Sequence, residues 1–155
     1  MTTKAAPPTR QAATWVPLLQ EILAREGRCR WPLRGQSMRP TLPDACEIDV
    51  VPLPVRVPLG ALVVFANGDA LVAHRLVRRV GGKWIAQGDN RYGPDRALEP
   101  SRVLGLVGAA YASDGHKCWP TPLSSTLAWF WIARYHMFRV IRYAARTISL
   151  HAERR

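Results

Sequence analysis

Apolar residues near the start of the chain recur three and four positions apart, which places them on one face of a helix. Thr14 is suited to the N-cap of this helix, and Gly27 is a natural stop. We therefore expect an amphipathic helix between these two residues. Its apolar face would hold Trp15, Leu18, Leu19, Ile22 and Leu23.

From Leu33 onward, short strand-like runs alternate with glycine and proline. Asn67-Gly68 is a strong type I′ hairpin signal, and Gly81-Gly82 marks a second turn. The pattern predicts a mainly β body, in an α+β protein, made of hairpins. Strands are expected at 47–53, 60–66, 70–80, 83–87 and 103–112.

The pattern becomes helical again after about residue 123. One arc of this helix is apolar, and the opposite arc carries Arg139, Arg142 and Arg146. A basic amphipathic helix rich in aromatic residues is typical of a segment that lies in a membrane interface. The alternative is a helix docked on the body with its arginines in water. The apolar arc consists of Phe130, Met137, Phe138, Val140, Ile141, Ala144, Ala145 and Ile148.

Charge is concentrated at the two ends of this 155-residue chain, whose formal net charge is +11. The net charge is +4 over 1–36 and +5 over 134–155, but only +2 over 37–133. Basic flanks around a nearly neutral body favour contact with an anionic membrane surface, through residues 123–150, over specific nucleic-acid binding. The expected parts are a tail and helix at 1–32, a β body at 33–113 and a basic amphipathic helix at 121–155.

The three cysteines, Cys29, Cys46 and Cys118, are far apart and show no zinc-type spacing. They are interpreted as free thiols, with a single disulfide left open. The sequence shows neither the apolar core of a signal peptide nor a run of apolar residues long enough to span a bilayer. The expected location is therefore cytoplasmic or peripheral to a membrane.

Three short stretches carry candidate chemistry. Residues 35–42, GQSMRPTL, hold Ser37 between a glycine that tolerates unusual backbone angles and a proline that fixes φ. The second stretch contains His74 next to Arg75. The third, residues 87–96, reads QGDNRYGPDR and contains Asp89 and Asp95. Together they supply a hydroxyl, an imidazole and two carboxylates.

In this order the three stretches resemble the type I signal peptidases and the related SOS-response repressors, over about residues 33–107. Ser37 lies in a GxSMxP pattern, and His74 precedes an arginine as in the archaeal and endoplasmic-reticulum enzymes. The segment from Gly88 to Arg96 is similar to the GDN…DR segment of the endoplasmic-reticulum type. The resemblance implies a signal-peptidase-like β fold and a serine endopeptidase that removes a leader or signal segment from a peptide or protein precursor. No cofactor and no metal are expected.

The roles follow from the chemistry of acyl transfer. A serine hydroxyl needs a neighbouring base, so Ser37 is the expected nucleophile and His74 the expected general base. Asp95, by its match to the Asp-Arg of the resemblance, is favoured over Asp89 to orient His74, and Asp89 is expected to hold its own turn through backbone hydrogen bonds. The Ser37 N–H is the obvious oxyanion donor, with a second donor from Gln36 or a neighbouring main-chain group.

Two other functions stay open at this point. The first is a non-catalytic protein of the same fold whose basic flanks bind membrane or nucleic acid. The second is a self-cleaving, DNA-binding regulator, which needs a helix-turn-helix that the single helix before Leu33 does not supply. A Ser–Lys dyad is not expected, because no lysine occurs between Lys4 and Lys83.

Overall fold

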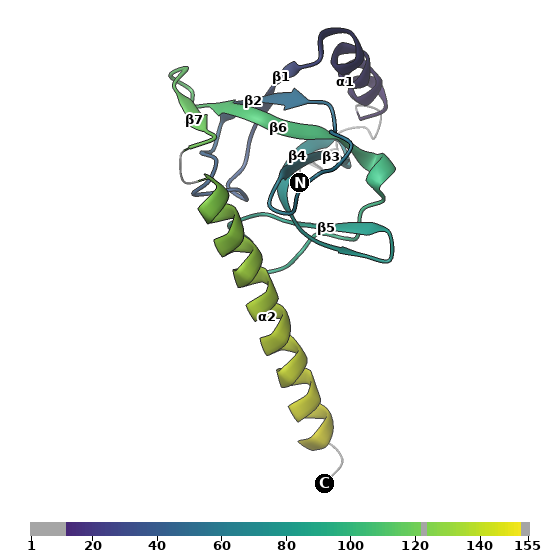
Figure 1. Cartoon of the computed structure of the whole chain (residues 1–155), viewed down its shortest axis with the longest axis vertical. Coiled ribbons are helices and arrows are strands. Elements are labelled where there is room, and N and C mark those ends of the chain that lie inside the picture. The colour runs from purple at the N-terminus through teal and green to yellow at the C-terminus, as the bar shows by residue number, and fades with distance from the viewer. Residues whose placement is uncertain (1–11, 122–123, 153–155) are drawn as a thin grey trace, which may run out of the picture.

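The computed structural model describes residues 12–121 and 124–152 of the chain. Within them, two α-helices accompany a seven-stranded antiparallel sheet (Figure 1). The expected α+β class with mainly β content is confirmed. The elements are α1 (Ala12–Glu26), β1 (Cys29–Leu33), β2 (Cys46–Val51), β3 (Leu62–Asn67), β4 (Ala70–Val80), β5 (Lys83–Gln87), the 3-10 helix η1 (Pro100–Arg102), β6 (Val103–Tyr111), β7 (Lys117–Trp119) and α2 (Ser124–Ala152).

The strands lie in the order β1-β2-β6-β3-β4-β5, and β7 adds to β6. The hairpin of β3 and β4 forms as expected, but its turn is shifted by one residue. Asn67 pairs with Ala70 as part of the ladder, so Gly68 and Asp69 make the turn. Only Gly68 of these two has a positive φ, which is the type II′ pattern rather than type I′.

The sheet also extends on both sides of the 33–113 range. Its edge strand β1 was missed because Pro32 reads as a strand breaker. Proline is tolerated at a sheet edge, where its missing N–H costs no ladder bond, and β1 pairs only with β2. β7 was missed because it has only three residues.

Strand β3 is buried on both faces and separates two hydrophobic clusters. Val64 belongs to a cluster with Leu19 and Leu23 of α1, so this face of the sheet is covered by the N-terminal helix. Val63 and Phe65 point to the other face and join the second cluster. Because side chains alternate along a strand, the central strands anchor both halves of the core at once.

Helix α1 ends as expected at Gly27, whose N–H donates to the Leu23 carbonyl. Its start differs from expectation, because the helix already begins at Ala12 and Thr14 therefore does not cap it. The tail before residue 12 lies outside the described residues. The periodicity placed Leu18 on the apolar face of the helix, but its side chain is half exposed, while its neighbour Leu19 is fully buried.

Helix α2 contacts β4, and its far half extends beyond the sheet (Figure 1). Ile132 and Tyr135 are buried against the body, although neither lies on the apolar arc expected from the sequence. Four residues of that arc, Phe130, Met137, Val140 and Ile141, are exposed and do not dock on the body. In the described part of the chain, neither helix combines the length and the apolar character needed to cross a bilayer.

Candidate active site

Ser37 lies in the loop between β1 and β2. The loop turns at Gly35, whose positive φ of 113° suits glycine, and the Gly35 N–H donates to Asp44 Oδ1 at 2.8 Å. This backbone hydrogen bond lowers the pKa of the Asp44 carboxyl. Met38 and Leu42 are buried in the core below, and the Leu42 N–H donates to the Met38 carbonyl. The serine is therefore held on a short, anchored turn.

A chain of hydrogen bonds joins the three residues expected to act together. His74 Nε2 lies 2.9 Å from Ser37 Oγ, and His74 Nδ1 lies 2.5 Å from Asp95 Oδ2. A carboxylate at Nδ1 accepts the proton there, which leaves Nε2 as the acceptor of the serine hydroxyl. The imidazole is almost fully buried, with Phe65 packed edge-on against it.

Each of the three comes from a different part of the fold. His74 is on strand β4, between β3 and β5, and pairs with Val63 of β3. Asp95 follows β5, and its N–H donates to the Ala86 carbonyl at 2.9 Å. The antiparallel sheet thus brings together residues separated by 37 and 21 positions in the sequence.

Gly88 and Asn90 support this arrangement from the turn after β5. A Cβ atom on Gly88 would lie 2.6 Å from the Ser37 carbonyl oxygen and 3.0 Å from His74 Nε2, so only glycine fits between them. The Asn90 N–H donates to the Ser37 carbonyl at 2.8 Å, and its side-chain amide donates to the Gln36 carbonyl at 3.1 Å. Gln36 therefore contributes an acceptor that ties down the serine loop.

The sequence suggested that the Asp89 side chain holds its own turn, but the structure shows a different role. Its carboxylate forms a bidentate, buried ion pair with Arg75, with distances of 2.9 and 2.6 Å, and also accepts the Thr41 hydroxyl. Arg75 completes its contacts by donating to the Gly60 carbonyl at 2.8 Å. The physical reason is the register: Arg75 follows His74 on β4 and points to the opposite side, where an isolated guanidinium would be costly to bury.

Helix α2 reaches the same turn through Arg134. Its Nη1 donates to the Asp89 carbonyl at 2.7 Å, and its guanidinium stacks on the Trp131 and Phe138 rings. The helix can approach because residue 60 is glycine: a Cβ there would meet Ala128 Cβ at 2.8 Å. The sequence analysis gave α2 no role in this site. The only sequence feature that pointed to one is that Arg134 lies among apolar neighbours.

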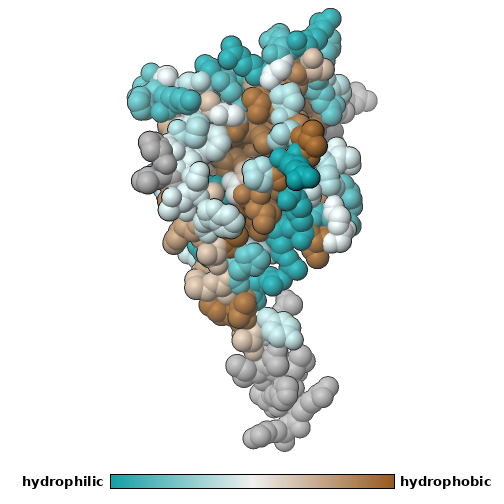
Figure 2. All heavy atoms as spheres, viewed as in Figure 1, coloured by the Kyte–Doolittle hydropathy of each residue, from teal (hydrophilic) through white to brown (hydrophobic). Residues whose placement is uncertain are grey.

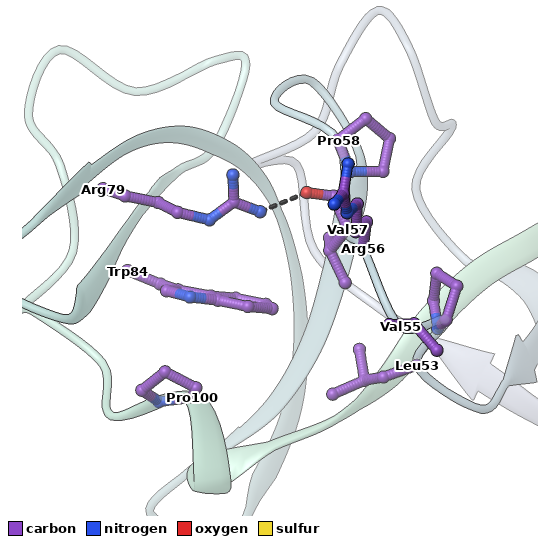
Figure 3. A pocket seen from close by; sticks show the side chains of 9 residues that line it. Leu53, Val55, Arg56, Val57, Pro58, Arg79, Trp84 and Pro100 are labelled. Carbon is purple, nitrogen blue, oxygen red and sulfur yellow. Dashed lines mark hydrogen bonds between the residues drawn. The ribbon is translucent and has the colours of Figure 1, made fainter.

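A narrow hollow of about 40 Å³ adjoins Ser37. Met38, Leu71 and Ala73 are among the residues that line it, and Arg34 and Ser37 add polar surface, so its walls are mixed in character. A larger hollow of about 640 Å³ lies elsewhere, between the loop after β2 and the β4–β5 hairpin. There Arg79 stacks over Trp84 and donates to the Val57 carbonyl, and no residue of the Ser37–His74–Asp95 chain lines this hollow (Figure 3).

The three cysteines are free thiols, and burial raises the pKa of each. No protein-family model matches this sequence, and no curated protein sequence matches it. Functional inference therefore rests on the geometry of these side chains.

Proposed function

We propose that this protein is a serine endopeptidase of the signal-peptidase type, which removes a leader or signal segment from a peptide or protein precursor. The observation that carries the proposal is the continuous hydrogen-bond chain Ser37–His74–Asp95. The same atoms in the same order activate serine nucleophiles on unrelated folds. The motif resemblance adds the substrate class and the fold type to the proposal.

The mechanism follows from these contacts. Ser37 Oγ attacks the scissile carbonyl while His74 Nε2 takes its proton, and Asp95 stabilises the imidazolium that results. His74 then returns the proton to the leaving amine, which leaves an acyl-enzyme on Ser37. A water activated by His74 hydrolyses this ester and restores the serine.

The developing oxyanion needs a donor beside the nucleophile. Among the residues that the structure describes, no acceptor is found for the Ser37 N–H, so this group is available. Asn90 and Gly88 support the same loop, and this helps to keep the donor oriented. Preorganised donors of this kind contribute about 3 kcal/mol to stabilising the transition state.

The size of the hollow at Ser37 supports a small residue before the cleaved bond. The hollow beside Met38, Leu71 and Ala73 is narrow, at about 40 Å³, which favours a small side chain there. The family resemblance carries the same expectation of a small residue, commonly alanine, at this position.

A fluorophosphonate reagent tests the nucleophile without knowledge of the natural substrate. We expect it to label the wild-type protein on Ser37 and to leave Ser37→Ala and His74→Ala unlabelled. Ser101→Ala and His116→Ala are matched controls, because both residues are exposed and lie outside the site. These two variants should label like the wild type.

Peptide cleavage provides the second test. Fluorogenic peptides that vary only at the residue before the cut should be cleaved best when it is alanine, and cleavage should require Ser37 and His74. Cleavage that survives both Ser37→Ala and His74→Ala would rule out the mechanism. A protein that neither labels nor cleaves while remaining folded would favour the non-catalytic alternative.

A further inference from the structure

Helix α2 presents an apolar strip that the body does not cover. The strip consists of Phe130, Met137, Val140 and Ile141, whose side chains are 58%, 54%, 61% and 54% exposed. Their spacing of seven, three and one positions places them on one side of the helix. Figure 2 shows hydrophobic side chains gathered on α2 where the helix leaves the sheet.

The strip faces away from the body because the opposite side of α2 makes the docking contacts. Ile132 and Tyr135, on the side of α2 opposite the strip, are only 6% and 5% exposed. Docking therefore fixes the direction in which the strip points. Adjacent exposed apolar side chains of this size on a rigid helix mark an interaction surface.

Charge indicates what covers the strip. α2 carries Arg134, Arg139, Arg142 and Arg146 and has no aspartate or glutamate between residues 124 and 152. Arg139 and Arg142 are exposed. A second copy of α2 packed on the strip would cover the apolar side chains, but it would leave the arginines of the opposite arc without an anionic partner. A nucleic acid bound to the arginines would leave the apolar strip in water.

An anionic lipid surface would both cover the apolar strip and supply anionic partners for the arginines. We propose that α2 lies in the interface of an anionic membrane, with the apolar strip inserted among the acyl chains and the arginines extended toward the lipid phosphates. Trp129, which is 67% exposed beside the strip, is a residue type favoured at the boundary between headgroups and hydrocarbon.

If the proposed peptidase function holds, binding of α2 to a membrane would also place the Ser37 site relative to the bilayer. Arg134 joins α2 to the Asp89 carbonyl, so a membrane-bound α2 would hold the Ser37 site at a fixed distance from the bilayer. Substrates that emerge from or lie on the membrane would then reach the serine. Lipid binding itself does not depend on this step, so the two proposals can fail separately.

The test is flotation of the full chain with vesicles of phosphatidylcholine, with and without phosphatidylglycerol. We expect binding only to the vesicles that contain phosphatidylglycerol. The double variant Met137→Glu/Ile141→Glu should lose at least about a hundredfold in binding, since burial of two apolar side chains is removed. Circular dichroism checks that each variant remains folded.

A matched control separates insertion from simple charge. Leu18→Glu/Val55→Glu introduces the same two negative charges at exposed apolar positions away from α2. It should bind vesicles within a few-fold of the wild type. Equal losses in the two double variants would overturn insertion of the strip, as would failure of the wild type to bind.

Two further outcomes would also overturn the proposal. One is a dimer in sedimentation velocity, without lipid, that Met137→Glu/Ile141→Glu dissociates, because a second copy would then be the occupant. The other is vesicle binding that heparin abolishes and that the strip variant retains, because the arginines alone would then explain it. Fluorophosphonate labelling, measured on the same samples, reports the serine site independently.

Discussion

Gly88→Ala is the sharpest perturbation of the proposed catalytic geometry. The added methyl group would lie 2.6 Å from the Ser37 carbonyl oxygen, 3.0 Å from His74 Nε2 and 3.1 Å from Ser37 Cβ. The backbone of Gly88 does not have a positive φ, so alanine introduces no strain of its own. Its effect therefore acts through the two reacting side chains.

The size of the effect follows from the distances. Ordinary contact of a Cβ atom begins at 3.4 Å, so relieving the 2.6 Å approach requires a shift of 0.8 Å. Any such shift separates Ser37 Oγ from His74 Nε2 or weakens the 2.8 Å hydrogen bond from the Asn90 N–H. Misplacement by about 1 Å costs about a hundredfold in rate, or about 3 kcal/mol of transition-state stabilisation.

The assay is the rate of fluorophosphonate labelling, followed by kcat/KM with the best peptide. Gly93→Ala is the matched control in the same loop, because its Cβ would meet only Arg142 Nη1, at 3.9 Å. We expect a loss of about a hundredfold for Gly88→Ala and no more than a few-fold for Gly93→Ala. Wild-type labelling by Gly88→Ala, or equal losses in both variants, would refute the reasoning.

The remaining predictions concern supports of the site and of the sheet. Asp89→Asn should destabilise the fold by about 3–5 kcal/mol in urea unfolding, because it leaves Arg75 buried without a carboxylate; a loss below about 1 kcal/mol would contradict this. Arg134→Met should lower kcat about tenfold while α2 stays helical by circular dichroism, because the hydrogen bond to the Asp89 carbonyl is lost; an unchanged kcat would argue against it. Asp49→Asn should lower Tm near neutral pH, because the hydrogen bond from Arg30 holds the pKa of Asp49 below its usual value. That stabilisation is present above the unfolded pKa and is lost as pH falls, so the Tm difference should close below about pH 4; a difference independent of pH would refute it.

The sequence predicted those elements whose local pattern agrees with their tertiary environment. The β4–β5 hairpin has glycines at two positions of positive φ, Gly81 and Gly82, so its turn was placed correctly. The strand β1 was missed because its proline is acceptable only at an edge, and edge position is a tertiary property. The docked side of α2 was not predicted either, because Ile132 and Tyr135, which are buried there, lie outside the apolar arc that the sequence indicated.

The site divides in the same way. Ser37 and His74 stood out as a possible nucleophile and base, and only the family resemblance favoured Asp95 over Asp89 as their partner; the structure brings Ser37, His74 and Asp95 together. The ion pair of Arg75 with Asp89 was missed because strand alternation gives the side on which a residue lies, but not the loop residue that meets it there. A contact such as this one depends on how the turn after β5 packs against the sheet, which the local sequence pattern does not give.

Asp89 is where the separate parts of the molecule meet. Its carboxylate fixes Arg75 and Thr41 beneath the serine loop, and its carbonyl accepts Arg134 from α2. Its neighbours Gly88 and Asn90 contact Ser37 directly. A force that moves α2 is therefore transmitted to the nucleophile through one three-residue turn.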